Sequence, residues 1–217
     1  MRIHRPERPP LIEAALLLFA VSQHFAGAQL LGPEFLVNSY TPSGQSRPAV
    51  AVDDSGNFVV VWSDYSQESL LDLGIFGQGF DLAAGPLGTE FHVNGFTTSH
   101  QQYPAVAASG TNNFLVVWDS NGQDGSARGI FGRRVTAGGL PAGSEFMVNS
   151  CTTGYQVIPA AATDSNGFFV VVWNGAGPTD NYGVFGQRFN PAGSTVGGEF
   201  RVNATTPGSQ QEAAVAT

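Results

Sequence analysis

The chain has 217 residues, of which 28 are Gly and 13 are Pro, and this density of helix breakers excludes a helical bundle. Apolar residues make up 42% and charged residues 12%, which favours a compact, turn-rich, all-β protein over a disordered polar chain. The net charge is −8 and every basic residue is Arg, so we expect neither nucleic acid nor an anionic membrane surface as a partner.

Residues 1–28 have the pattern of a cleaved signal peptide. A positive start that contains three Arg is followed by an apolar stretch from Leu11 to Ala20. Ala26-Gly27-Ala28 then matches the small–x–small pattern of a cleavage site. The apolar stretch is short for a bilayer span, so an uncleaved anchor is the less favoured alternative. We expect export to a secreted or cell-surface location, with no membrane contact after cleavage.

Residues 29–217 form one repeat domain. The pattern Glu-Phe-x-Val-Asn begins at Glu34, Glu90, Glu145 and Glu199, at intervals of 56, 55 and 54 residues. Three further markers keep the same spacing: Trp62, Trp118 and Trp173; Gly74, Gly129 and Gly183 of Gly-Ile/Val-Phe-Gly; and Pro48, Pro104 and Pro159, followed by Ala213. The units therefore lie near 48–94, 104–149 and 159–203, and a partial unit begins at 213.

Each unit predicts four short antiparallel strands. In the first unit we expect them at 48–52, 57–62, 74–80 and 90–94, with a turn at 53–56 between the first two. From Phe58 to Trp62 the second strand is apolar at every position, so both of its faces should be covered. The middle position of Glu-Phe-x-Val-Asn varies and should face solvent, as Leu36, His92, Met147 and Arg201.

Four-stranded units of this length, buried on both faces, predict a β-propeller-like array of about three blades, with another repeated β-sheet array as the alternative. The sequence stops at 213–217, inside an expected first strand, and three blades are fewer than the usual minimum of four. We therefore expect an incomplete ring, as in a piece of a longer protein. Its open sheet edges should promote self-association.

The repeat resembles one that is common in large exported bacterial proteins of mostly unknown function. The resemblance rests on Glu-Phe-x-Val-Asn, Phe-Val-Val-Val-Trp and Gly-Ile-Phe-Gly-Gln, covers residues 34–217, and is clearest in Gly183–Phe189. The blade layout is also similar to that of sialidase-type propellers. The chain departs from their Ser-x-Asp-x-Gly-x-x-Trp turn, because Trp62 follows Gly56 by six positions. The resemblance implies export and repetition, and it implies no reaction.

Residues present in every unit are expected to be structural, because catalysis needs one site whereas folding needs every blade. The repeated Trp should lie in the core, and the repeated Gln should bind backbone groups in the linkers between blades. The alternatives are a sugar-stacking platform for the Trp and a ring of identical ligand pockets for the Gln. These structural candidates are Trp62, Trp118, Trp173, Gln45, Gln101, Gln156 and Gln210.

No catalytic or cofactor-binding residue is assigned from the sequence. Asp119, Asn121 and Asp124 lie in an oxygen-rich segment and are weak calcium candidates, but their spacing favours a solvated hairpin loop. Cys151 is the only Cys, so it forms no intramolecular disulfide, and we expect it to be packed and not activated. The remaining Arg fall at different strand positions in different units: Arg47, Arg128, Arg133, Arg134, Arg188 and Arg201.

Two functions from different classes follow. The favoured one is an exported, non-catalytic module that binds an unknown protein or glycan or serves as a surface scaffold, with no cofactor. The alternative is a fragment of a secreted propeller-fold hydrolase that acts on glycans. A hydrolase would need a unit-specific cluster of Asp or Glu, Tyr and Arg at one end of the ring, and the sequence pattern indicates no such cluster.

Overall fold

The computed structural model describes residues 34–68, 72–178, 180–205 and 207–216. The predicted signal peptide, residues 1–28, lies outside the described residues. The compact unit discussed below comprises residues 36–217. Across the described ranges the chain forms no helix that could span a membrane.

The described residues form three four-stranded antiparallel sheets, each in simple sequence order, which we call blades 1, 2 and 3. Blade 1 consists of β1 (Gln45–Val52), β2 (Phe58–Tyr65), β3 (Leu73–Phe80) and β4 (Pro86–His92). Blade 2 consists of β5 (Gln101–Ala108), β6 (Phe114–Asn121), β7 (Arg128–Val135) and β8 (Phe146–Met147). Blade 3 consists of β9 (Gln156–Thr163), β10 (Phe169–Gly177), β11 (Asp180–Phe189) and β12 (Phe200–Arg201).

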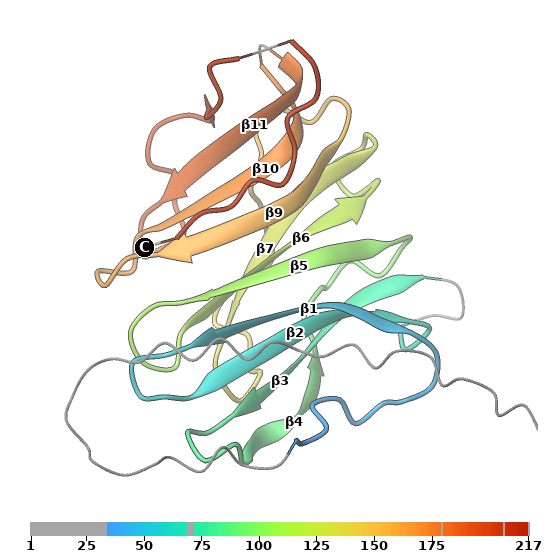
Figure 1. Ribbon diagram of the computed structural model, residues 1–217, viewed down its shortest axis with the longest axis vertical. Coiled ribbons are helices and arrows are strands. Elements are labelled where there is room, and N and C mark those ends of the chain that lie inside the picture. Colours follow the sequence, from blue (N-terminus) through green and yellow to red (C-terminus); the bar gives the residue numbers. More distant parts are fainter. Residues whose placement is uncertain (1–33, 69–71, 179, 206, 217) are drawn as a thin grey trace, which may run out of the picture. The chain divides into compact units, whose positions relative to one another are not determined.

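The blades adjoin through their first strands, with β5 lying between β1 and β9 (Figure 1). Each blade has a Trp face, which carries the repeated Trp, and an opposite face. The Trp face of blade 2, with Trp118, packs on Val59 and Val61 of blade 1. In the same way the Trp face of blade 3, with Trp173, packs on the opposite face of blade 2. This repeated packing confirms the expected all-β, propeller-like array of three blades.

The middle blade shows the predicted burial of a second strand on both faces. Along β6 the residues from Phe114 to Ser120 are all buried, because blades 1 and 3 cover its two sides. The opposite face of blade 3 has no other described blade on it, and Phe200 and Val202 are exposed there. Full coverage therefore depends on a blade's neighbours as well as on its own sequence.

The fourth strand differs from its predicted extent. The prediction ran from Glu90 to Asn94, but β4 begins at Pro86 and ends at His92, while β8 and β12 contain two residues each. The strand ends early because the side chain of Asn94 takes over from the backbone: its Oδ1 accepts the N–H of Ile75 at 2.7 Å. Asn149 and Asn203 make the same bond to Ile130 and Val184.

The second Gly of Gly-Ile/Val-Phe-Gly accommodates the Phe of Glu-Phe-x-Val-Asn. Gly77 on β3 lies opposite Phe91 on β4, and a Cβ at Gly77 would come within 2.8 Å of the ring. Gly132 with Phe146 and Gly186 with Phe200 repeat this pairing. The two repeated motifs are therefore one packing unit at the outer edge of each blade.

Candidate functional site

The repeated Asn and Gln bind each other and the linker between blades. Asn94 Nδ2 donates to the Phe96 carbonyl at 2.9 Å and to Gln101 Oε1 at 3.3 Å. Gln101 Nε2 donates in turn to the Thr98 carbonyl at 3.1 Å. The same contact joins Asn149 to Gln156 and Asn203 to Gln210, and Gln45 donates to Pro42 and Asp64. The Gln side chains are thus engaged within the linkers.

The repeated Glu holds the linker that enters its own blade. Glu90 Oε2 accepts hydrogen bonds from the Ser39 N–H at 2.7 Å and from the Ser39 hydroxyl at 2.8 Å. Glu199 binds the N–H and hydroxyl of Ser150 in the same way, and Glu145 accepts the N–H of Gly95. We call each of these contacts a Glu clamp. The repeated carboxylates therefore serve the fold.

The repeated Trp are internal. Trp62, Trp118 and Trp173 are 3%, 0% and 0% exposed. A stacking platform for sugars needs exposed ring faces, which these three side chains do not offer. A ligand site is therefore to be sought among residues that differ from blade to blade.

One such set lies at a shared bulge of the first strands. Arg47, Tyr103 and Ile158, each just before the repeated Pro, have φ of 55°, 54° and 54°, and Glu212 at the next step has 59°. Few residues other than glycine adopt this left-handed region. The backbone conformation is repeated while the side chain changes. These positions present blade-specific side chains on a common backbone.

Two of these side chains meet across blades 1 and 2. The guanidinium carbon of Arg47 lies 3.9 Å from the centre of the Tyr103 ring, the geometry of a cation–π contact. Arg47 Nη1 also donates to Gln102 Oε1 at 3.2 Å. The first strands of the two blades are joined by blade-specific side chains at this end.

A buried carboxylate lies at the neighbouring junction of blades 2 and 3. Asp119 on β6 is fully buried, and its Oδ1 accepts a hydrogen bond from Arg128 Nη1 at 3.0 Å. Its Oδ2 accepts the N–H of Ile158 at 3.3 Å. Burial raises the pKa of Asp119 to about 6, although the charges of Arg128 and Arg47 and the two hydrogen bonds oppose this rise.

The structure therefore corrects one expectation from the sequence. The Arg residues occupy different strand positions, but Arg47 and Arg128 both act on Asp119, and Arg47 stacks on Tyr103. Asp, Arg and Tyr thus do gather at one end of the blades. The sequence pattern hid this cluster because its members come from four strands in two blades.

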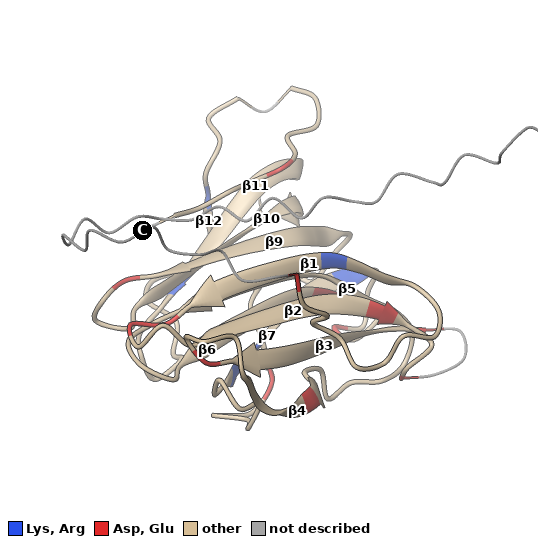
Figure 2. Cartoon of the chain, turned by 60° about the horizontal axis from the view of Figure 1, so that its bottom comes forward, with Lys and Arg blue, Asp and Glu red and all other residues tan. Residues whose placement is uncertain are grey.

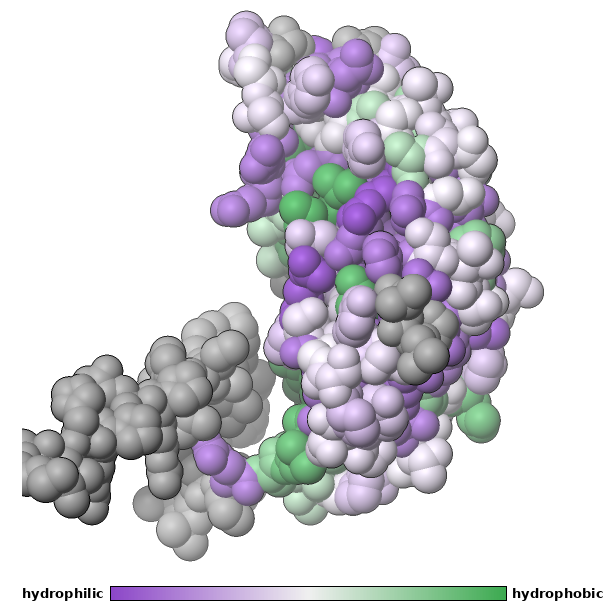
Figure 3. Space-filling model, turned by 90° about the vertical axis from the view of Figure 1, so that its right-hand side faces the viewer, coloured by the Kyte–Doolittle hydropathy of each residue, from purple (hydrophilic) through white to green (hydrophobic). Residues whose placement is uncertain are grey.

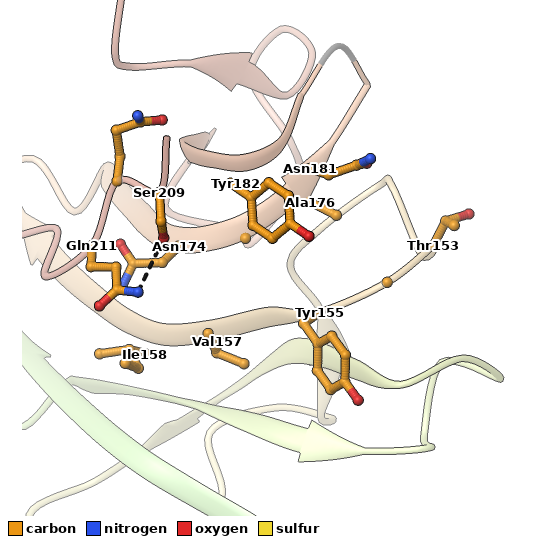
Figure 4. A pocket seen from close by; sticks show the side chains of 13 residues that line it. Thr153, Tyr155, Val157, Ile158, Asn174, Ala176, Asn181, Tyr182, Ser209 and Gln211 are labelled. Atoms are coloured by element: carbon orange, nitrogen blue, oxygen red, sulfur yellow. Dashed lines mark hydrogen bonds between the residues drawn. The ribbon is translucent and has the colours of Figure 1, made fainter. Parts of the chain in front are cut away.

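A pocket of about 470 Å³ opens on blade 3 at the same end of the blades. Its walls come from the linker residues 153–155, from β9, β10 and β11, and from the C-terminal segment 209–211. Figure 4 shows Tyr182 on β11, Asn174 on β10 and Tyr155 just before β9 around this space. The two Tyr are 65% and 64% exposed, and none of the thirteen lining residues is Asp, Glu, His or Arg.

The weak calcium candidates have other partners. Asp119 is paired with Arg128, Asn121 Nδ2 donates to Ser99 Oγ at 2.8 Å, and Asp124 Oδ1 accepts the N–H of Ser126. Within the described ranges no group of three His, Cys, Asp or Glu is placed to hold a metal ion.

Cys151 and His92 also lie apart from the pocket. Cys151 is half-buried in a linker, where its N–H is bound by Glu199. His92 stacks on Phe76 with ring centres 4.7 Å apart and lies 3.4 Å from Glu68. None of these side chains lines the pocket.

No repeated motif in the sequence indicates Tyr155 or Tyr182, which line the pocket. Tyr155 precedes the repeated Gln, where the other units have Gly44, His100 and Ser209. Tyr182 precedes the repeated Gly, where the other units have Leu73 and Arg128. At both positions the residue type differs from one unit to the next. This variation at a fixed repeat position is the sequence feature that could have indicated both Tyr.

No protein-family model matches the chain, and no curated protein matches its sequence. Among solved structures, the endo-arabinase from Bacteroides thetaiotaomicron is similar at a TM-score of 0.49 and 11% identity, over 81% of this chain and 66% of that one. TcdA4 from Morganella morganii is similar at a TM-score of 0.40 and 9% identity, over 70% of this chain and 7% of that one. The chain spans just under two thirds of the length of the endo-arabinase, and no activity is carried over from either protein.

Proposed function

We propose that the chain is an exported, non-catalytic binding module of the β-propeller type, without a cofactor, that takes a glycan or a protein as its ligand. The observation that carries the proposal is that the repeated side chains and most of the pocket side chains are different sets of residues. The repeated Asn, Gln, Glu and Trp are engaged inside the fold, whereas the pocket on blade 3 is lined, apart from the repeated Gln210, mostly by residues that change between blades. The sequence pattern of residues 1–28 supports export.

Charge and polarity favour a polar, uncharged contact surface. Figure 2 shows few Arg, with acidic residues mostly in or next to loops. Figure 3 shows hydrophilic residues spread over the face turned to the viewer, with apolar residues in separate spots. Such a surface suits hydrogen bonding to hydroxyl and amide groups. It does not suit phosphate backbones, which require clustered cations.

The pocket lining also favours binding over catalysis. Glycoside hydrolysis needs a pair of carboxyl groups beside the scissile bond, and the lining holds none. A carboxyl with a raised pKa is present in Asp119, but it is fully buried and bound on both oxygens. We interpret Asp119 as an ion-paired junction residue of blades 2 and 3.

A hydrolase remains the second candidate, and one observation favours it. Asp119, Arg128, Arg47 and Tyr103 are the residue types that a propeller-fold hydrolase gathers at one end of its ring. A role in hydrolysis would require Asp119 to reach a substrate from its buried position. The two candidates therefore differ in whether bound glycan is cleaved.

Binding and cleavage can be measured on the same sample. The full chain is incubated with soluble polysaccharides and with immobilised bacterial surface proteins, and both retention and released reducing ends are recorded. The proposal predicts retention on one of these ligands without released products. Reducing ends that appear with the wild type and vanish with Asp119→Asn would overturn it in favour of the hydrolase. Retention on neither class of ligand would overturn the binding function itself.

A further inference from the structure

We propose that the pocket on blade 3 binds a neutral saccharide, with the Tyr182 ring stacking on a sugar face and Asn174 Nδ2 donating a hydrogen bond to a sugar hydroxyl. This inference rests on the proposed binding function and narrows it to one ligand class and one site.

Asn174 supplies the first argument, because it has an unused donor at the pocket. Its side chain is 3% exposed, and it lines the pocket from β10. Its Oδ1 accepts the N–H of Ala213 at 3.2 Å, which fixes the orientation of the amide. Nδ2 is buried and has no hydrogen-bond partner among the described residues. Buried donors are nearly always paired, so this one calls for an acceptor from water or a ligand.

The equivalent place in blade 2 shows what normally occupies it. Asp119 stands there in place of Asn174, and Arg128 in place of Tyr182, one repeat earlier. Asp119 Oδ2 accepts a backbone N–H from β9, the following first strand, and Asn174 Oδ1 accepts one from Ala213 in the C-terminal segment. Its second oxygen is bound by Arg128. In blade 3 neither the carboxylate nor the guanidinium is present, because Asn174 and Tyr182 replace Asp119 and Arg128. Asn174 Nδ2 takes the place of Asp119 Oδ1 and has no partner among the described residues.

Tyr182 and Tyr155 supply the stacking surface. Arg128 is largely buried against Asp119, whereas Tyr182 is 65% exposed beside the opening, and Tyr155 lies on the side of β9 (Figure 4). Exposed aromatic rings beside hydrogen-bonding amides match a ligand with an apolar C–H face and polar edges, which is the chemistry of a sugar ring. The volume of about 470 Å³ falls within the usual range of ligand pockets.

The absence of charge in the lining selects a neutral sugar. None of the described residues that line the pocket is Arg or His, so a sugar carboxylate or sulfate would have no counter-ion among them. The chain's net charge of −8 also opposes a polyanion. A neutral saccharide needs no counter-ion and is not repelled by the negative charge of the chain.

The test is affinity electrophoresis of the full chain in gels that contain xylan, mannan or dextran, with polygalacturonate as the acidic counterpart. We expect retardation by at least one neutral polymer and none by polygalacturonate. Asn174→Asp keeps the acceptor for Ala213 but removes the donor, and Tyr182→Ala removes the stacking ring. Each should weaken binding roughly tenfold or more, the effect of losing one good contact. Asn166→Asp and Tyr65→Ala, matched changes on other exposed turns and strands, should leave binding unchanged.

Folding of each variant is checked by its thermal melt, and Tyr182→Phe, which keeps the ring, should bind like the wild type. Neutral-polymer binding that survives both Asn174→Asp and Tyr182→Ala would overturn the site while leaving the binding function intact. Retardation by polygalacturonate alone would overturn the neutral class. Retention on protein with no retardation by any neutral polymer would also overturn this inference. Cleavage of the polymer would instead overturn the proposed function.

Discussion

Asp119 Oδ1 lies 3.0 Å from Arg128 Nη1 while Asp119 Oδ2 accepts the N–H of Ile158 at 3.3 Å, so one buried carboxylate joins β6, β7 and β9. The contact couples the central strands of blade 2 to the first strand of blade 3. Removing its charge has consequences that depend on pH.

Asp119→Asn should change how stability depends on pH. Burial raises the pKa of Asp119 from 3.8 to about 6, so the folded state holds a proton that the unfolded state has released. Binding of this proton contributes its full stabilisation of the folded state below the unfolded pKa of 3.8. That contribution is lost as the pH rises through the folded pKa of about 6. The stability of the wild type relative to Asp119→Asn should therefore fall between pH 4 and pH 7, by up to about 3 kcal/mol. Urea unfolding of both proteins across this range measures it, and a constant or rising difference would contradict the assignment.

Glu90→Gln should produce the opposite slope. Burial acts to raise the pKa of Glu90, but hydrogen bonds from Gln67, Ser39 and Tyr40 outweigh it and lower the pKa below the usual 4.5. This group contributes stability above its unfolded pKa and loses it as pH falls through the folded value. The advantage of the wild type over Glu90→Gln should shrink as the pH falls below 4.5. If the advantage stays flat in acid, the Glu clamp does not hold the charged form.

The repeat pattern predicted the blades well because its information is local. Alternating apolar residues, turn clusters and the Trp spacing set three four-stranded sheets, and the structure has them. The extent of the fourth strand was wrong, because the pattern did not show that the Asn94 side chain replaces a backbone acceptor. Glu90 was recognised as repeated, but its partner Ser39, 51 residues earlier, could not be deduced from either motif. Contacts across folded space have no signature in a linear pattern.

The candidate site was less predictable for a related reason. Asn174 and Tyr182 stand on β10 and β11, Tyr155 lies just before β9, and no motif links the three. Asp119 was considered for calcium, because its neighbours in sequence are polar. Its partner in space is Arg128, reached across the β6–β7 hairpin. The residues of a site are close in the folded structure, whereas the sequence gives only their order along the chain.

Trp118→Ala should be strongly destabilising. The side chain is fully buried in the interface between blades 1 and 2, so truncation leaves a large cavity between two sheets. We expect a loss of about 3–5 kcal/mol in the free energy of unfolding. Equilibrium urea unfolding provides the measurement, with Leu140→Ala, an exposed site in the same blade's loop, as the near-neutral control. Equal midpoints for Trp118→Ala and wild type would mean that the ring does not hold the interface.

Gly79→Ala tests the closeness of blades 1 and 2 at a second place. A Cβ at Gly79 would lie 1.6 Å from the carbonyl oxygen of Ala137, a backbone atom of blade 2 that has little freedom to move. We expect a loss of about 1–3 kcal/mol or more from the forced separation. At Gly44 an added Cβ meets no atom of the described residues within 4 Å, so Gly44→Ala should have little effect. Thermal melts of the two variants should differ clearly, and similar melting temperatures would contradict the packing.

The Glu clamps also affect how the array can lengthen or be cut. Glu145 accepts a hydrogen bond from Gly95 in the linker 50 residues earlier. Each Glu clamp therefore joins residues that lie about one repeat apart in the sequence. A repeat cut out between two successive Glu-Phe-x-Val-Asn motifs contains a Glu without its linker and a linker without its Glu. When copies are placed in tandem, the Glu of one copy can bind the linker of the copy before it. Duplication of this sequence therefore supplies its own joints, and the cooperativity of unfolding should grow with each added copy.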